Sequence, residues 1–325
     1  MASGNTHMEL GNLDNNKISK GGITTSYSVI HFVVDIVFLV ILIIAGIITE
    51  AAPLPVERLG FFCDSETLRF PFLPSTIPTL SLIFFVLIPA AFIIGLSILE
   101  HFIYKYAHLR LQTQLPSTPF HVKLHCIYRE LKIPYGLWKT MLTLYAFIVG
   151  IFLTLVVTNA IKLSVGELRP HFLSICQPNF TELECRDSFG YATYVTNYTC
   201  YGTDTENIRE ARLSFPSGHA SFIVYNMVFL MFFLELKPYI PRGIRSAVTL
   251  LFALTGMLVA ITRLYDYKHH ANDVIGGSII GLVTAIFTYF FHLRLNTVPR
   301  SVESLEAAKS ITSDEAPPGN ATKSN

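Results

Sequence analysis

Residues 29–49 read VIHFVVDIVFLVILIIAGIIT, an almost unbroken apolar run that holds a single carboxylate, Asp35. A helix that crosses a bilayer needs about 20 mostly apolar residues, because the hydrocarbon core is about 30 Å thick. With five further runs of this kind, the spans start near Val29, Ile77, Thr140, Ala220, Ala247 and Val274 and end near Thr49, Leu99, Ile161, Leu234, Arg263 and Leu293. The sequence therefore predicts an all-α integral membrane protein with six transmembrane helices.

The composition supports a membrane protein and excludes other classes. Hydrophobic residues make up 51% of the chain and charged residues only 14%, whereas about 25% of an ordinary soluble domain is charged. The net charge of +1 provides no overall basic field, which a nucleic-acid-binding surface needs. We therefore expect the lipid bilayer and molecules within it as partners, and no nucleic acid.

The orientation in the membrane follows from the basic residues between the spans. Two connections, after the second span and after the fourth, hold the cations Lys105, Arg110, Lys123, Arg129, Lys132, Lys139, Lys237, Arg242 and Arg245. Short basic connections face the cytosol, which places both termini there and residues 50–76, 162–218 and 263–273 on the outer face. The predicted organisation is a disordered cytosolic N-terminal tail (1–26), a six-helix membrane domain (27–295) and a disordered cytosolic C-terminal tail (296–325).

The outer segments carry sequons and most of the cysteines. Asn179-Phe-Thr and Asn197-Tyr-Thr are glycosylation sequons, so both asparagines are candidate glycosylation sites. Four of the five cysteines are predicted to lie outside, namely Cys63, Cys176, Cys185 and Cys200. Disulfides form on that side of a membrane, but four cysteines allow three pairings and the spacing selects none. Free thiols in a loop are the alternative.

Ionisable residues beside the spans form three clusters. They occupy residues 162–171, 214–219 and 263–273 and read KLSVGELRPH, SFPSGH and RLYDYKHHAND. A charge at the centre of a transmembrane helix costs roughly 2.5 to 3.5 kcal/mol, so charges this close to the spans require a reason. The predicted topology places all three clusters at the outer surface. Lys162, Arg169 and Arg263, with free N–H groups at Ser217 and Gly218, are typical of a phosphate-binding site.

Two histidines and a carboxylate in these clusters could supply the chemistry. His269 and Asp273 are four residues apart, so on one helical turn the carboxylate can accept the ring N–H and fix the tautomer. The other ring nitrogen would attack phosphorus, and His219 would protonate the departing alcohol and later activate water. This arrangement requires no metal and no other cofactor. Glu167 and His171, in the first cluster, receive no role.

Each of these residues alone also has a plain structural interpretation. Lys162 and Arg169 would be interfacial anchors. His219 would be a helix-end residue. His269 and Asp273 would be a structural hydrogen-bonded pair. Their coincidence at one membrane surface favours the functional interpretation.

The three clusters resemble the tripartite signature of the type 2 phosphatidic acid phosphatase superfamily, written KxxxxxxRP, PSGH and SRxxxxxHxxxD. The flanking text, including GFFC at residues 60–63 and DYKHH at residues 266–270, is similar to the lipid phosphate phosphatase branch in particular. The resemblance covers residues 29–293 and leaves out both tails. One departure is Thr262, which stands where the pattern has Ser; threonine keeps the hydroxyl.

The resemblance implies a six-helix membrane enzyme of phospholipid metabolism and lipid signalling. Its substrates would be phosphatidate, lysophosphatidate, ceramide 1-phosphate and sphingosine 1-phosphate, hydrolysed without a metal through a phosphohistidine. The resemblance makes His269 the nucleophile, Asp273 its orienting partner and His219 the leaving-group acid. The phosphate-binding set would be Lys162, Arg169, Ser217, Gly218 and Arg263. It also implies homo-oligomers in the plasma membrane, with the endoplasmic reticulum, Golgi or other internal membranes as the alternative.

Three other functions fit parts of the sequence. A catalytically silent relative would bind lipids without hydrolysing them, but such relatives lose members of the motif set, and all members are present here. A phosphotransferase would use the same phosphoenzyme and pass the group to an alcohol. A transporter would need polar groups at the midplane of several spans. Asp35 is the clearest candidate for such a group, although a carboxyl hydrogen-bonded against another helix is the preferred interpretation.

Overall fold

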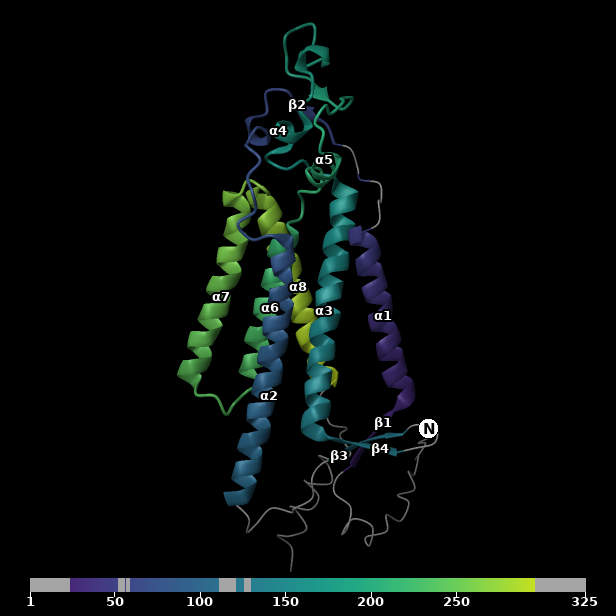
Figure 1. The fold of residues 1–325 in the computed structure, drawn as a ribbon, viewed down its shortest axis with the longest axis vertical. Coiled ribbons are helices and arrows are strands. Elements are labelled where there is room, and N and C mark those ends of the chain that lie inside the picture. The colour runs from purple at the N-terminus through teal and green to yellow at the C-terminus, as the bar shows by residue number, and fades with distance from the viewer. Residues whose placement is uncertain (1–23, 52–55, 57–58, 111–120, 126–129, 296–325) are drawn as a thin grey trace, which may run out of the picture.

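The computed structural model describes residues 24–51, 56, 59–110, 121–125 and 130–295. Six long helices run side by side as an elongated bundle (Figure 1): α1 Val29–Ala51, α2 Phe84–Arg110, α3 Tyr135–Val165, α6 Gly218–Glu235, α7 Arg242–Tyr265 and α8 Ala271–Leu295. Each is long and apolar enough to cross a membrane. The prediction of a multi-pass helical membrane protein is therefore confirmed, while both predicted terminal tails lie almost wholly outside the described residues.

Helix α6 is the centre of the bundle and contacts α2, α3, α7 and α8. Its Tyr225 and Phe229 pack in the main core with Phe147 of α3 and Ile93 of α2. The Tyr225 hydroxyl donates a hydrogen bond to the Phe147 carbonyl at 2.7 Å. The apolar side chains on the outward faces of α1, α2, α7 and α8 are exposed, which is the arrangement that lipid tails require.

Two glycines of α8 allow it to approach α6 closely. A Cβ atom on Gly277 would lie 2.3 Å from the Ser217 carbonyl oxygen, and one on Gly281 would lie 2.3 Å from that of Ser221. Small residues at such positions let transmembrane helices come into backbone contact. This contact brings the N-terminal ends of α6 and α8 together.

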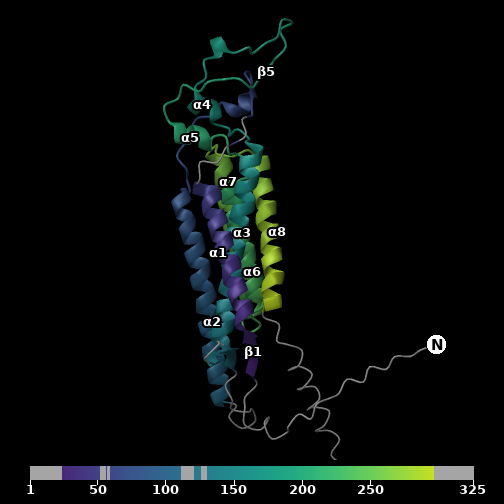
Figure 2. The same cartoon turned by 90° about the vertical axis from the view of Figure 1, so that its right-hand side faces the viewer.

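A cap of short elements covers one end of the bundle (Figure 2). We use the name cap for residues 59–76 and 166–213, which contain β2 Phe61–Phe62, η1 Glu66–Leu68, α4 Phe172–Cys176, η3 Phe180–Glu182, β5 Tyr194–Val195 and α5 Thr205–Glu210. Strands β2 and β5 pair antiparallel, with Phe61 opposite Val195. The 3-10 helix η2, Thr79–Ile83, leads from the cap into α2.

Two disulfides hold the cap together, Cys63–Cys185 and Cys176–Cys200. They settle the pairing that the spacing of the cysteines had left open. The first joins the connection before α2 to the long connection before α6, and the second closes a loop within the long connection. The four cysteines of the cap are therefore paired rather than free.

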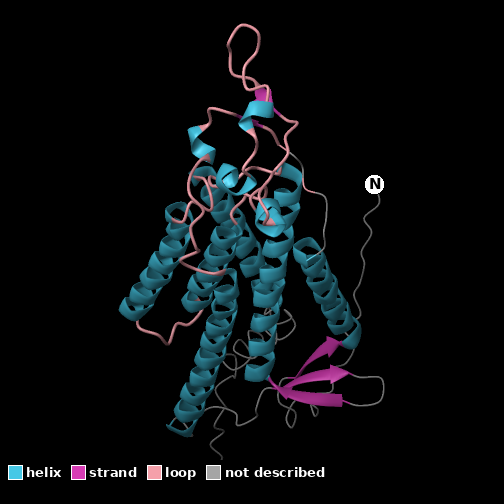
Figure 3. Cartoon of the chain, turned by 45° about the horizontal axis from the view of Figure 1, so that its top comes forward, coloured by secondary structure: helices cyan, strands magenta, loops and turns pink. Residues whose placement is uncertain are grey.

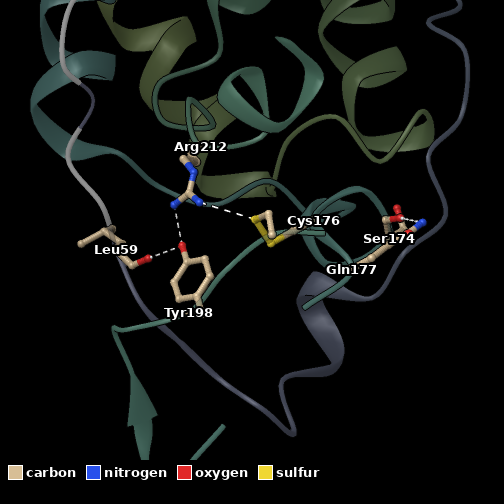
Figure 4. Close-up of a disulfide and its surroundings, with 7 residues drawn as sticks. Leu59, Ser174, Cys176, Gln177, Tyr198 and Arg212 are labelled. Atoms are coloured by element: carbon tan, nitrogen blue, oxygen red, sulfur yellow. Dashed lines mark hydrogen bonds between the residues drawn. A yellow bond between two sulfur atoms is a disulfide. The ribbon is translucent and has the colours of Figure 1, made fainter. Parts of the chain in front are cut away.

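Arg212 organises the core of the cap around the second disulfide (Figure 4). Its guanidinium lies 5.2 Å from the ring centroid of Phe172 and 5.1 Å from that of Tyr198. It donates hydrogen bonds to the Tyr198 hydroxyl at 2.5 Å and to the Cys200 sulfur at 3.6 Å. The Tyr198 hydroxyl in turn donates to the carbonyl of Leu59 at 3.0 Å. These contacts connect both parts of the cap.

A three-stranded sheet lies at the opposite end of the bundle (Figure 3). Its strands β1 Thr24–Ser28, β3 His121–His125 and β4 Glu130–Pro134 are arranged in the order β1-β3-β4. Strand β1 runs parallel to β3, and β3 runs antiparallel to β4. The sequence did not predict this sheet, and β1 begins within the segment expected to be a disordered tail. Its pairing joins segments nearly a hundred residues apart, which local sequence does not specify.

Candidate active site

The three clusters singled out in the sequence meet at the cap end of the bundle. The first leaves α3 at Gly166, whose φ of 64° ends the helix in the left-handed conformation that suits glycine. The second begins α6, and the third joins α7 to α8. Between them lies a cavity of about 470 Å³, lined among others by the predicted site residues Lys162, Arg169, Gly218, His219, Arg263 and His269.

The other two predicted residues, Ser217 and Asp273, lie directly behind this lining and are fully buried. The Ser217 N–H donates to the Asp273 carbonyl at 3.0 Å. The Ser214 hydroxyl donates to Oδ2 of Asp273 at 2.5 Å. A Cβ atom on Gly218 would lie 3.3 Å from Nζ of Lys162. The structure therefore brings together all eight residues predicted for catalysis and phosphate binding.

His269 faces the cavity as a buried, neutral imidazole. Burial lowers the pKa of its ring to about 3, the positive charges of Arg169 and Lys162 act in the same direction, and Asp273 opposes them. A neutral ring has the free lone pair that a nucleophile needs. Its Nδ1 lies 3.6 Å from Oδ2 of Asp273, slightly beyond a hydrogen bond. Nδ1 has no hydrogen-bond partner among the described residues, and Asp273 is the carboxylate nearest to it.

The Asp273 carboxylate is held by several neighbours. Its Oδ2 accepts hydrogen bonds from the Ser214 hydroxyl and, at 2.8 Å, from the His270 backbone N–H. Its Oδ1 has no hydrogen-bond partner among the described residues. Glu167 and His270 approach it from the side away from the cavity. The carboxylate is thus fixed in place beside His269.

His219 enters the cavity from the first turn of α6. Its Nε2 is buried and has no hydrogen-bond partner within the described part of the chain. Burial lowers the pKa of its ring to about 3, and the positive charges of Arg263, Lys162 and Arg169 act in the same direction. The ring is therefore neutral, and its unpaired nitrogen can accept a proton.

Arg263 is the most completely fixed cation of the site, with only 1% of its surface exposed. Its guanidinium donates to the Thr262 hydroxyl at 3.1 and 3.2 Å and to Oδ2 of Asp266 at 2.9 Å. Asp266 also accepts hydrogen bonds from the N–H and hydroxyl of Thr76. The threonine that departs from the family pattern therefore uses its hydroxyl to orient Arg263, as a serine would.

Comparison with known proteins agrees with this geometry. The sequence pattern of the PAP2 superfamily matches residues 143–296. A putative phosphatidate phosphatase of Drosophila melanogaster is 32% identical over 79% of this chain and 69% of its own length. The chain belongs to the PAP2 superfamily. Phospholipid phosphatase 1 of Rattus norvegicus and phospholipid phosphatase 2 of Mus musculus are each 30% identical, over 80% of this PAP2 protein and 84% of their own length. No solved structure gives a significant match.

These comparisons confirm the family that the three motifs indicated and the assignment of this PAP2 protein as a phosphatase enzyme. The segment that matches the PAP2 superfamily, residues 143–296, contains all three clusters, at residues 162–171, 214–219 and 263–273. The roles of the individual residues rest on the geometry and are taken up below.

Lys268 and His171 are among the residues that line the cavity of this PAP2 protein and to which the sequence assigned no role. Lys268 places its Nζ 3.7 Å from the ring centroid of Phe72, and burial lowers its pKa to about 8. His171 donates from Nδ1 to the Tyr267 carbonyl at 2.7 Å, and burial lowers its pKa to about 4. Both residues belong to the clusters quoted from the sequence. Whether their side chains point into the cavity depends on the conformation of the cap and of the turn before α8, which motif spacing does not predict.

The cavity also extends beyond the cation cluster of this PAP2 protein. Its lining also includes apolar side chains of the bundle, among them Leu82, Leu155 and Phe222. Glu50 of α1, another lining residue, accepts a hydrogen bond from Asn159 of α3 at 2.7 Å. A molecule with a charged head and an apolar body matches this distribution.

Proposed function

We propose that this PAP2 phosphatase hydrolyses lipid phosphates, with phosphatidate, lysophosphatidate, ceramide 1-phosphate and sphingosine 1-phosphate as substrates. The observation that carries the proposal is the neutral, buried His269, which faces a cavity that also holds Lys162, Arg169 and Arg263. The named activities of the relatives, phosphatidate phosphatase and phospholipid phosphatase, support the same substrate class.

The reaction proceeds in two displacements at phosphorus. Burial and the charges of Arg263, Lys162 and Arg169 lower the pKa of His219 to about 3, so His219 takes up its proton together with the phosphoryl dianion that offsets those charges. Nε2 of His269 attacks, the bond from phosphorus to the lipid oxygen breaks, and His219 donates this proton to that oxygen. The products of this step are the dephosphorylated lipid and a phosphohistidine. His219 then removes a proton from water, which attacks phosphorus and breaks the P–N bond. Asp273 holds Nδ1–H of His269 throughout and stabilises the positive ring of the intermediate.

The cations of the site and the N-terminal end of α6 stabilise the transferring phosphoryl group. The planar guanidinium groups of Arg169 and Arg263 bind phosphoryl oxygens in pairs, and Lys162 adds a compact charge. The Gly218 N–H, at the positive end of α6, completes an anion site. The Ser217 N–H, which the sequence predicted to be free, instead donates to the Asp273 carbonyl. Electrostatic stabilisation of this kind is the main contribution that a protein makes to phosphoryl transfer.

The apolar side chains in the cavity lining favour a lipid over a soluble phosphate ester. A bound phosphoryl group beside His269 would leave the rest of the substrate against Leu82, Leu155 and Phe222. Burying acyl methylene groups there contributes about 0.8 kcal/mol each. A soluble phosphate ester of similar charge would lack this contribution.

We further propose that the cap and the active site face the outside of the cell or an organelle lumen, with both termini in the cytosol. Lys237, Arg242 and Arg245 lie at the opposite end of the bundle, as the excess of cations in cytosolic connections requires. Disulfides in the cap agree with an oxidising side. The plasma membrane is the proposed location, with internal membranes as the alternative, and homo-oligomers are the proposed assembly.

Both sequons belong to the cap, and we propose glycans at Asn179 and Asn197. Asn197 is exposed, which suits a large modification. Asn179 is half-buried, and its Nδ2 donates to Glu182 at 2.5 Å. The expected mobility shift after glycosidase treatment should therefore depend more on Asn197 than on Asn179, and Asn197→Gln tests this.

The decisive experiment measures phosphate release from phosphatidate by the purified protein in detergent with excess EDTA. We expect chelator-insensitive turnover, which His269→Ala should lower about a thousandfold or more because the nucleophile is lost. His101→Ala, on the exposed surface of α2, is the matched control. Turnover that EDTA abolishes would contradict the metal-free route, and a wild type inactive on several lipid phosphates would indicate the catalytically silent, lipid-binding alternative.

A further inference from the structure

Three potential metal ligands surround the Asp273 carboxylate on the side away from the cavity. Glu167, His270 and Asp273 each offer one ligand atom, and these atoms lie within 4.8 Å of one another. Nδ1 of His270 lies 3.5 Å from Oδ2 of Asp273 and 3.8 Å from Oε1 of Glu167. The group combines residues from the connection after α3 and from the start of α8.

The separations fit a small divalent ion of the zinc type. Zn²⁺ binds nitrogen and oxygen at about 2.0 to 2.2 Å in tetrahedral geometry, which places neighbouring ligand atoms about 3.3 to 3.6 Å apart. The separations of 3.5 and 3.8 Å from Nδ1 of His270 require a small contraction around an ion, and the carboxylate oxygens of Glu167 and Asp273, within 4.8 Å of each other, can require a larger one. Imidazole nitrogen and carboxylate oxygen are both zinc ligands, and three protein ligands with a water in the fourth position form an open zinc site.

Two buried atoms in this group lack hydrogen-bond partners. Asp273 is fully buried, and its Oδ1 has no partner in the described part of the chain. Nδ1 of His270 is also buried without a hydrogen bond to any described residue. An unsatisfied buried polar atom costs about 1 to 3 kcal/mol. The 3.5 Å separation places Oδ2 of Asp273 next to Nδ1 of His270, so a bound cation would satisfy Nδ1 of His270 and neutralise the two carboxylates.

The group is reached by a route that differs from that of the substrate. None of the three residues lines the cavity. The side chains of Glu167 and His270 are 37% and 26% exposed, whereas Asp273 is buried between them and His269. A metal ion can therefore approach from solvent beneath the cap while a lipid phosphate occupies the cavity.

We propose that Glu167, His270 and Asp273 form an inhibitory site for a divalent transition-metal ion, with Zn²⁺ as the fitting ion. The consequence rests on the proposed function, because Asp273 is the residue that orients His269. A metal that takes the Asp273 carboxylate withdraws it from Nδ1 of His269. Since the cavity stays open to substrate, the ion lowers kcat and leaves KM unchanged.

Metal binding itself provides the first test, because it does not depend on turnover. Equilibrium dialysis with radioactive Zn²⁺ is performed on the full chain with Cys126→Ser, which removes the cysteine outside the two disulfides. We expect Glu167→Gln and His270→Asn each to lose one bound equivalent relative to this parent. Glu184→Gln and His101→Asn, at exposed positions elsewhere, should lose none. Equal stoichiometry in all five proteins would overturn the proposal.

Inhibition provides the second test, with a short-chain lipid phosphate as substrate and buffered free Zn²⁺. The wild type should lose kcat at constant KM, and Glu167→Gln should need about tenfold or more Zn²⁺ for half-inhibition. Equal inhibition of Glu167→Gln and wild type would indicate that the substrate itself binds the metal. A raised KM would indicate that the metal binds in the cavity. Either result would overturn the proposal. If the wild type shows no turnover, the proposed function fails while the dialysis result still stands.

Discussion

The contact between α8 and α6 at Gly277 should control catalysis from outside the cavity. In Gly277→Ala the new methyl group would lie 2.3 Å from the Ser217 carbonyl oxygen and 3.3 Å from Cβ of Ala220. Contacts of Cβ below 3.0 Å essentially do not occur, so the helices must separate by at least 0.7 Å, from 2.3 to 3.0 Å. Asp273 lies one turn earlier on α8, and its carbonyl accepts the Ser217 N–H. The separation therefore moves the carboxylate relative to His269.

A misplacement of about 1 Å can cost a hundredfold in rate, so we expect Gly277→Ala to lower kcat about tenfold to a hundredfold. The overpacked contact should also cost about 1 to 3 kcal/mol of stability. Both are measured on protein purified in detergent, from the rate of phosphate release and from thermal unfolding. Gly95→Ala is the matched control, because a Cβ there meets nothing within 4 Å. A Gly277→Ala enzyme with wild-type kcat and melting temperature would refute the reasoning.

Three further predictions address the site and the cap. Thr262→Ser should keep kcat/KM within about twofold, whereas Thr262→Val should lower it about tenfold. Only the valine removes the hydroxyl that accepts two hydrogen bonds from Arg263. Equal kcat/KM values for the two variants would contradict this role. Replacing Cys63 and Cys185 by serine should lower the thermal stability of the cap, by up to about 5 kcal/mol for a loop of 122 residues in the chain-entropy model, and an unchanged melting temperature would argue against it. Burial lowers the pKa of His171 to about 4 in the folded protein, against 6.5 for an ordinary histidine. As the pH drops from 6.5 to 4 the unfolded state therefore binds a proton that the folded state does not, and the free energy of unfolding should fall by up to about 3 kcal/mol. Thermal unfolding measured across this pH range should show a flatter dependence for His171→Gln.

The membrane fold follows from the sequence because its signal is local. Runs such as residues 29–49 are long enough to cross a bilayer by themselves, and each satisfies its backbone hydrogen bonds within one helix. The alternation of spans and connections then places residues 162–171, 214–219 and 263–273 at one end. The convergence of Lys162, His219 and His269 around one cavity could therefore be expected before the structure was known.

The cap depends on contacts that the sequence does not encode locally. The choice of Cys185 rather than Cys176 or Cys200 as the partner of Cys63 depends on how two connections fold against each other. The Arg212 contacts with Tyr198 likewise join residues placed together only by the folded cap. The same is true of the sheet at the opposite end, whose pairing links distant segments of the chain.

The sequence by itself determined the class of protein, the six spans and the residue types of the site, because hydrophobic length and motif spacing are properties of neighbouring residues. Only the tertiary structure decided which side chains line the cavity, as for Lys268, and which lie behind it, as for Asp273. The physical reason is that these directions are set by helix contacts such as that at Gly277, where a difference of less than 1 Å changes the position of a catalytic group.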